Sequence, residues 1–213
     1  MVKRAIVMAI SVVLALAVAA PIASGQTAPQ RQDLKALTEA WWTWATAVPS
    51  PLDGSYSSPD PRCEGEFVDG VFFLAGTTGG DPVERTCTVP ADTALFFPVI
   101  NSFTTAEEPN YPWGPHKVVA KALANGDVSA TLDGEDLKIK RIATGPFTLP
   151  FLDPNIFGVP GGPYPFPAVS DGLWVYLPEG LEPGEYTVHF EGTSVRSNGN
   201  PFSVDVTYNL IVV

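Results

Sequence analysis

Proline and glycine constrain this chain most, because 22 Pro and 19 Gly are spread over its 213 residues. These residues interrupt helices, so their density excludes a helical bundle and a coiled coil. Apolar residues make up 45% of the sequence, which is too much for intrinsic disorder. We therefore expect a folded, turn-rich domain.

The charge balance excludes two classes of partner. The chain carries 23 acidic and 12 basic residues, and its formal net charge is −11. Nucleic acids and anionic membranes repel such a surface, so we expect neither as a partner.

The first residues have the pattern of an export signal. A short basic pair precedes the uncharged apolar run 5–20, and the small residues 23–25 suit a signal peptidase. We predict a signal peptide over 1–25, cleavage before Gln26, a polar lead-in over 26–32, and secretion or a periplasmic location. An uncleaved anchor is the weaker alternative, because about 20 apolar residues are needed to cross a bilayer. After cleavage we expect no membrane span.

Cysteine usage is consistent with export. Cys63 and Cys87 are the only two cysteines. In an oxidising compartment an isolated pair is more typical of a disulfide than of a redox or metal site. We predict that Cys63 and Cys87 form a structural bridge, worth about 3 kcal/mol on the chain-entropy estimate.

One long helix is expected after the lead-in. Apolar residues from Leu34 to Val48 recur at three- and four-residue spacing, Asp33 is a suitable N-cap, and prolines follow from Pro49. The spacing places Trp41 and Trp44 on the apolar face, which predicts that they are core residues. Trp42 falls to the side, and it fits either the core or a ligand platform.

Strand patterns follow the helix. Two runs, 71–74 and 94–97, are continuously apolar, which is typical of strands buried on both faces. Further strands are expected over 84–89, 173–177, 185–191 and 202–213, and the last alternates between apolar and polar residues. A short second helix is expected over 115–124, with Pro115 in its first turn.

A hairpin is expected over 127–141, with a two-residue turn at Asp133 and Gly134. This turn opposes Ala130 to Leu137 and Val128 to Ile139 on one face. It opposes Ser129 to Lys138 and Asp127 to Lys140 on the other. A four-residue loop would oppose Val128 to Arg141 instead. The first register joins apolar with apolar and acidic with basic residues, so we expect it.

The segment 144–170 differs from the rest, with seven prolines, five aromatic residues and few strand signals. Long loops in compact domains are usually functional or disordered, and this aromatic content argues against disorder. The loop could contact a ligand together with two tryptophans, or its aromatic residues could cover the edge of the fold and bind nothing. The candidate ligand contacts are Trp42, Trp113, Phe151, Phe157, Tyr164 and Phe166.

These patterns predict an all-β fold. Tyr186 follows a Pro-Gly turn at the start of a strand, which resembles the tyrosine corner of immunoglobulin-like sandwiches. We expect residues 33–213 to form one antiparallel β-sandwich, immunoglobulin-like or jelly-roll-like, with an N-terminal α-helix and one short second helix.

The sequence offers little for catalysis or metal binding. It has two histidines, His116 and His189, and no Gly-x-Ser-x-Gly motif, so a Ser-His-Asp hydrolase is disfavoured. Both methionines leave with the signal peptide and both cysteines are expected to be bridged, so we expect no copper or zinc site and no cofactor. On its strand, His189 should point outward with Thr187 and Glu191 and be solvated.

Oxygen ligands leave two possibilities open. Acidic turns at 53–54, 133–136, 153–155 and 171–172 could bind calcium or be ordinary turns. A glycosidase needs only two carboxylates, and six are candidates: Glu64, Glu66, Asp69, Glu84, Asp171 and Glu191.

Three phrases resemble a group of exported bacterial proteins that have no assigned activity. They are 73–80 (FLAGTTGG), the pair 87–91 (CTVPA) and 94–101 (ALFFPVIN), and the pair 170–174 (SDGLW) and 183–190 (PGEYTVHF). The resemblance implies a bacterial exported protein with a shared nucleus over 63–101, and it implies no activity. We therefore expect a non-catalytic binding or structural domain whose partner is a polysaccharide or another envelope component. The alternative is a secreted carbohydrate-active hydrolase with paired carboxylates.

Overall fold

The computed structural model describes residues 33–46, 67–68, 70–105, 113–151, 162–163, 167–196 and 198–213. The expected signal peptide, the lead-in and Cys63 lie outside these ranges. Among the described helices, none has the length and apolar character needed to cross a membrane.

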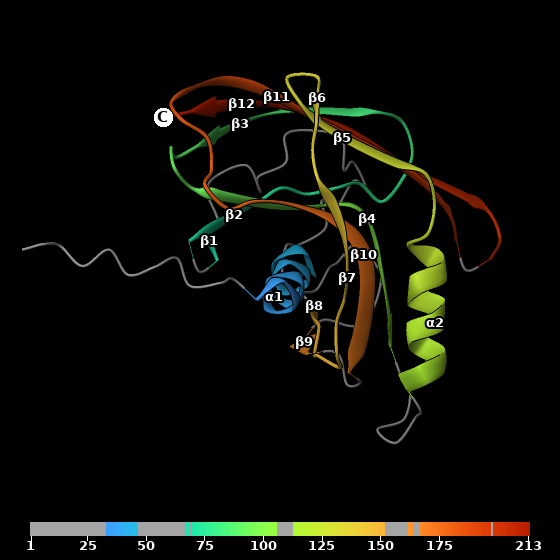
Figure 1. Cartoon of the computed structure of the whole chain (residues 1–213). Helices are drawn as coiled ribbons and strands as arrows, with labels where there is room; N and C mark the ends of the chain where they lie inside the picture. Colours follow the sequence, from blue (N-terminus) through green and yellow to red (C-terminus); the bar gives the residue numbers. More distant parts are fainter. Residues whose placement is uncertain are drawn as a thin grey trace, which may run out of the picture. The chain divides into compact units, whose positions relative to one another are not determined.

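Within these ranges the structure has two helices and three sheets, and most of the described part is β-structure (Figure 1). The helices are α1 (Leu34–Thr46) and α2 (Trp113–Leu123). The first sheet contains, in spatial order, β1 (Phe67–Val68), β2 (Val71–Phe73), β4 (Ala94–Thr105), β10 (Ala168–Leu177) and β7 (Ile139–Ala143). The second sheet contains β3 (Val83–Val89), β12 (Pro201–Val212), β11 (Gly184–Val195), β5 (Val128–Leu132) and β6 (Glu135–Asp136). A small third sheet pairs β8 (Pro150–Phe151) with β9 (Gly162–Pro163).

Both large sheets are mixed, so the prediction of an antiparallel fold is wrong in two places. β2 pairs with β4 in parallel, and β3 pairs with β12 in parallel. Each parallel pair includes a strand from the segment 71–105, which passes from the first sheet to the second and back. The remaining pairs, including the long pair β11–β12, are antiparallel.

The two large sheets pack face to face and share a core (Figure 1). Leu95, Phe97 and Val175 reach it from the first sheet, and Phe190 and Tyr208 reach it from the second. The predicted alternation of β12 is confirmed, because Val204, Val206, Tyr208, Leu210 and Val212 are all buried.

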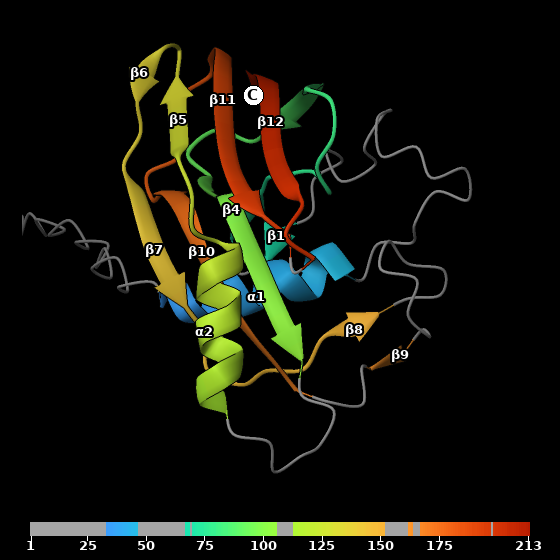
Figure 2. The same ribbon diagram turned by 90° about the vertical axis from the view of Figure 1, so that its right-hand side faces the viewer.

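The first sheet is covered on its other face as well. Helix α1 packs there through Trp41, whose ring lies 5.3 Å from that of Trp174, while α2 contacts β4 and β10 from the opposite side (Figures 1 and 2). All three residues of β2 and the β4 residues Leu95–Ile100 are buried. The expectation that these apolar runs are buried on both faces is therefore confirmed.

Both expected helices are present. Asp33 caps α1 through Oδ1, which accepts a hydrogen bond from the Lys35 backbone N–H at 2.9 Å. Trp41 and Trp44 are buried, as predicted. Helix α2 begins at Trp113, two residues earlier than expected. Pro115 is compatible with this start, because the first turn of a helix does not use its backbone N–H groups.

The prediction of a hairpin over 127–141 is confirmed at its turn and wrong beyond it. Asp133 and Gly134 both have positive φ, and Leu132 pairs with Glu135 in the predicted register. The Leu137 N–H also donates to the Ala130 carbonyl at 2.8 Å. The pair Val128–Ile139 and both polar pairs do not form.

The second arm changes sheets, which explains the error. After Leu137 the chain crosses to the first sheet, where β7 pairs with β10 and Ile139 lies opposite Val175. β5 pairs with β11 instead, so Val128 lies opposite Gly192. Pairing with these long strands replaces the local hairpin.

The aromatic loop 144–170 overlaps a strand at its end. β10 begins at Ala168, five residues before the predicted start, and its residues Ala168–Gly172 pair with the end of β4. Ser170, Asp171 and Gly172 are typical turn residues, so local propensity hid this part of the strand.

Candidate functional site

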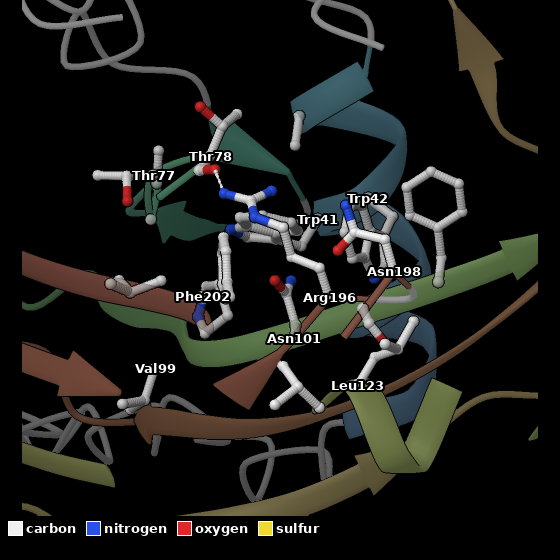
Figure 3. A pocket seen from close by; sticks show the side chains of 18 residues that line it. Trp41, Trp42, Thr77, Thr78, Val99, Asn101, Leu123, Arg196, Asn198 and Phe202 are labelled. Atoms are coloured by element: carbon white, nitrogen blue, oxygen red, sulfur yellow. Dashed lines mark hydrogen bonds between the residues drawn. The ribbon is translucent and has the colours of Figure 1, made fainter. Parts of the chain in front are cut away.

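A cavity of about 600 Å³ lies beside β4. Its described walls come from α1, the turn after β2, the middle of β4, the end of α2 and the connection between β11 and β12. Figure 3 shows these side chains arranged around Asn101 and Arg196. Its volume is within the range of small-molecule binding sites.

The α1 wall consists of two anchored tryptophans. Trp41 Nε1–H donates to the Leu74 carbonyl at 3.0 Å, and Trp42 Nε1–H donates to Ser170 Oγ at 2.7 Å. The Trp42 ring also meets Phe103 edge to face at 4.9 Å. Because both indole donors are used, this wall offers a ligand apolar surface only.

The turn that forms the next wall is held by Arg85 on β3. Arg85 is buried, and its guanidinium donates to the carbonyls of Ala75 and Gly76 at 2.9 and 3.1 Å and to the Tyr208 hydroxyl at 2.9 Å. The Tyr208 hydroxyl in turn donates to the Ala75 carbonyl and accepts from the Ala75 N–H. These bonds fix the turn against the second sheet and keep the cavity open.

The sequence pattern predicts that Tyr186 bonds to distant backbone, but in the structure Tyr208 makes such bonds, to Ala75. Tyr186 is half buried beside the core, and within the described residues its hydroxyl has no hydrogen-bond partner. The predicted tyrosine corner at Tyr186 is thus not seen in the part of the chain that the structure describes.

Arg196 spans the mouth of the cavity. Its guanidinium lies 4.8 Å above the ring of Phe202, and Nη2–H donates to the Thr78 carbonyl at 3.0 Å (Figure 3). The residue is exposed and is the only charged side chain among the described lining residues. Since a guanidinium has five N–H groups, donors remain for a ligand.

Asn101 brings an unused donor into the interior of the cavity. β4 contains a bulge, because Pro98 pairs with Trp174 while Ile100 pairs with Leu173, which leaves Val99 as the extra residue. Asn101 then faces the same side as Gly172, where a Cβ added to the glycine would lie 2.8 Å from Asn101 Cβ. Asn101 Nδ2 is buried and has no hydrogen-bond partner among the described residues. A buried amide without a partner is costly, and a bound acceptor would remove that cost.

Arg141 holds the end of α2 near the cavity, and it is also ion-paired with Asp171. Arg141 Nη1 lies 2.5 Å from Asp171 Oδ1, and Arg141 Nη2 donates to the Ala124 carbonyl at 3.3 Å and to Asn125 Oδ1 at 3.0 Å. Burial raises the pKa of Asp171 above its usual value, although Arg141 opposes this shift. The preceding residue on α2, Leu123, lines the cavity.

The described walls carry hydrogen-bonding side chains from Asn, Ser, Thr and Arg residues. They contain no Asp, Glu, His or Cys. Ser102 lines the cavity, but its hydroxyl donates to the Ala120 carbonyl at 2.7 Å and has no described base beside it.

The structure brings one of the six candidate ligand contacts to the cavity. Trp42 lines it, whereas Trp113 begins α2 and contacts His116 at 5.6 Å without being among the described lining residues. Phe151 is in β8, and its side chain is outside the described part. Phe157, Tyr164 and Phe166 lie outside the described residues, as does Cys63, so the aromatic strip and the disulfide stay predictions. Cys87 is buried on β3.

The three candidate carboxylates that the structure describes, Glu84, Asp171 and Glu191, are not among the described lining residues of the cavity. Asp171 is paired with Arg141, Glu84 Oε1 accepts from Asn209 Nδ2 at 2.7 Å, and Glu191 is on the outer face of the second sheet. Among the calcium candidates, Asp133 Oδ1 accepts from the Thr187 N–H at 2.7 Å, as in an ordinary turn. The remaining candidates lie outside the described residues: Glu64, Glu66, Asp69 and the turns 53–54 and 153–155.

Sequence patterns do not point to Arg196 or Asn101. Asn101 ends the phrase 94–101, but nothing in that phrase marks it as a ligand contact, and Arg196 belongs to no quoted motif. Only the bulge in β4 and the β11–β12 connection bring the two residues together. No family model, no curated protein and no solved structure matches this chain.

Proposed function

We propose that the mature protein is a non-catalytic binding domain of the bacterial envelope or extracellular space, and that its ligand binds in the cavity beside β4. The observation that carries this proposal is the combination of apolar walls with two donors, Arg196 and the unpartnered Asn101 Nδ2. A hydrolase with paired carboxylates stays the alternative. The described lining residues include no carboxylate, so they do not support this alternative.

The walls favour a ligand with an apolar face and an anionic acceptor. Trp41, Trp42 and Phe103 provide the apolar surface. Arg196 is suited to a carboxylate, because its planar fork can donate two parallel hydrogen bonds. Asn101 Nδ2 would meet a second acceptor deeper inside. An acidic sugar at the end of an envelope polysaccharide has this chemistry, and so does a small aromatic acid.

Filling the cavity tests the proposal. An ideal Cβ at Gly76 has no neighbour nearer than 4.0 Å, and Gly76 lines the cavity without needing a positive φ. Gly76→Leu should therefore fill the space without straining the backbone. Gly145 has an equally open environment and is not among the described lining residues, so Gly145→Leu is the matched control.

The probe is anilinonaphthalene sulfonate, which combines an aromatic body with one anionic group. We expect saturable binding by the unmodified protein, at least tenfold weaker binding by Gly76→Leu, and unchanged binding by Gly145→Leu. Arg196→Gln and Asn101→Leu should each weaken binding about tenfold, as expected for the loss of one charge-assisted or buried hydrogen bond. Equal binding by Gly76→Leu and Gly145→Leu, both folded by circular dichroism, would place the ligand elsewhere.

The choice of natural ligand follows from a second comparison. Oligogalacturonate should bind through the same residues, and a neutral cello-oligosaccharide of equal length should bind more weakly. If Arg196→Gln leaves this preference unchanged, the anionic part of the proposal is wrong.

We also propose that the two packed sheets are a β-sandwich of the immunoglobulin-like or jelly-roll type, and that Cys87 is bridged to Cys63. The shared core between the sheets and the burial of Cys87 support these two proposals. Mass spectrometry of the exported protein without reductant should find no free thiol, and two free thiols would contradict the bridge.

A further inference from the structure

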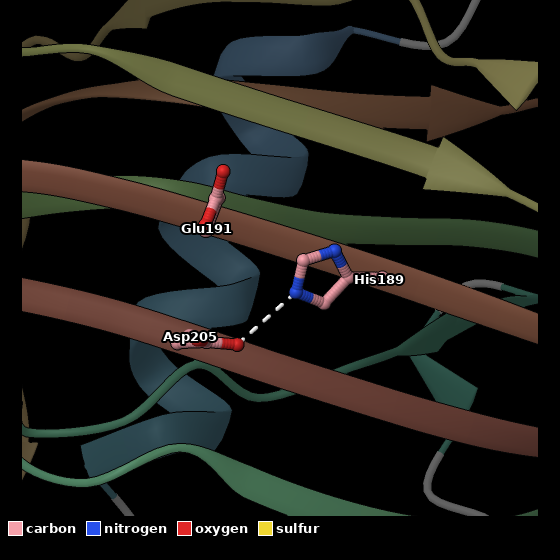
Figure 4. A group of neighbouring side chains, drawn as sticks. All are labelled: His189, Glu191 and Asp205. Carbon is pink, nitrogen blue, oxygen red and sulfur yellow. Dashed lines mark hydrogen bonds and ion pairs between the residues drawn. The ribbon is translucent and has the colours of Figure 1, made fainter. Parts of the chain in front are cut away.

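A second group of polar side chains lies on the outer face of the second sheet. His189 and Glu191 are two residues apart on β11, so they point to the same side, and Asp205 lies directly opposite Glu191 on β12. Figure 4 shows His189 and Asp205 directed toward each other across the two strands, with Glu191 beside them on β11. One potential ligand atom from each lies within 4.8 Å of the other two.

The His189–Asp205 contact already has nearly the spacing of two metal ligands. His189 Nε2 lies 3.1 Å from Asp205 Oδ1. Zinc binds nitrogen and oxygen at about 2.0–2.1 Å, so two ligands of a tetrahedral ion lie about 3.3–3.4 Å apart. A zinc ion could therefore replace the shared proton if the pair widened by a few tenths of an ångström.

Glu191 needs only a side-chain rotation to join them. Its Oε1 accepts a hydrogen bond from Ser129 Oγ at 3.2 Å, and the residue is exposed. The side chains of His189 and Asp205 are 36% and 39% exposed, which leaves room for a water molecule as the fourth ligand.

The charges around the group favour a cation. Two carboxylates directly opposite each other on antiparallel strands are destabilising. The same face also carries Glu84 and Glu185, and the outward-facing strand positions of β3, β5, β11 and β12 that the structure describes include no Lys or Arg. A divalent cation would offset this repulsion.

We propose that His189, Glu191 and Asp205 form a zinc-binding site that joins β11 to β12 on the face away from the cavity. The imidazole favours zinc over calcium and magnesium, which prefer sets made only of oxygen ligands. The scarcity of histidine and free cysteine in the sequence does not exclude such a site, because one histidine is enough when two carboxylates stand beside it.

Calorimetric titration of the tag-free mature protein with Zn²⁺ tests the site. We expect one equivalent of Zn²⁺ to bind and no response to Ca²⁺. His189→Ala and Asp205→Asn should each weaken Zn²⁺ binding at least tenfold. Co²⁺ should give the intense visible absorption of a four-coordinate ion, and His189→Ala should abolish it.

Two control variants separate this site from other zinc binding. Glu185→Gln removes a carboxylate from the same strand and face, and His116→Ala removes the other histidine of the chain. Both should bind Zn²⁺ like the unmodified protein. No saturable Zn²⁺ binding, unchanged binding in His189→Ala, or a loss of binding in His116→Ala would each overturn the proposal. Binding of anilinonaphthalene sulfonate in the cavity does not depend on the zinc site, so it tests the proposed function separately.

Discussion

The two large sheets bury their residues in different ways. The first is covered on both faces, by the second sheet and α2 on one side and by α1 on the other, and its residues Val71–Phe73 and Leu95–Ile100 are continuously buried. The second sheet is covered on one face, and β3, β11 and β12 alternate between buried and more exposed residues.

This difference decides where polar residues can act. In the first sheet a polar side chain has to find a partner inside the protein, as Asp171 does with Arg141 and Ser170 with Trp42. On the second sheet the outward residues are solvated and can change at little cost. The cavity lies where β4 continues past the Val99 bulge. Asn101 is half-buried there, and its buried Nδ2 has no hydrogen-bond partner among the described residues.

The largest effect is expected from a truncation in the doubly covered sheet. Trp174 is fully buried and stacks on Phe96 at 4.8 Å. Trp174→Ala should lower the free energy of unfolding by about 4 kcal/mol, because it leaves a large cavity that cannot collapse. Urea denaturation measures this, with the half-buried Trp113→Ala as the control. A loss for Trp174→Ala no larger than for the control would contradict the double coverage.

An intermediate and pH-dependent effect is expected at the buried ion pair. Burial raises the folded-state pKa of Asp171, so the folded protein holds this proton more tightly than the unfolded chain, and ionisation lowers stability as the pH rises. Arg141 limits this loss. Arg141→Met should therefore cost little at low pH and about 3 kcal/mol at pH 7, where an unpaired buried carboxylate is left.

Stability curves of Arg141→Met between pH 3 and pH 7 measure this dependence. The double variant with Arg141→Met and Asp171→Asn should lose most of this pH dependence, because residue 171 then has no carboxyl group to ionise. A cost in Arg141→Met that is equal at both pH values would show that the ion pair does not control it.

The smallest effect is expected on the exposed face of the second sheet. Without zinc, Asp205→Asn should change the free energy of unfolding by less than about 0.5 kcal/mol, because it removes a half-exposed carboxylate opposite Glu191. Thermal unfolding in chelator measures this. A loss above 2 kcal/mol would show that this face is not separable from the fold.

Much of the fold is predictable from local patterns. The apolar spacing of α1, the continuous runs of β2 and β4, the alternation of β12 and the turn at Asp133 and Gly134 all depend on nearby residues. The parallel pairs, the crossing of β7 and the early start of β10 are not predictable, because partners distant in the sequence decide them. The candidate site is predictable even less, since Trp42 is the only one of its described lining residues that the sequence marks as a candidate ligand contact.

By itself the sequence determined which residues had to be buried and where the chain had to turn, because hydrophobic burial and backbone geometry act within a few residues. It also placed His189 and Glu191 on one face of a strand. Only the tertiary structure decided which strands became neighbours. Register brought Asp205 to His189, a bulge turned Asn101 into the cavity, and the end of β11 carried Arg196 to its mouth. Such contacts depend on strand pairing across the whole fold, where many segments compete for the same strand edges.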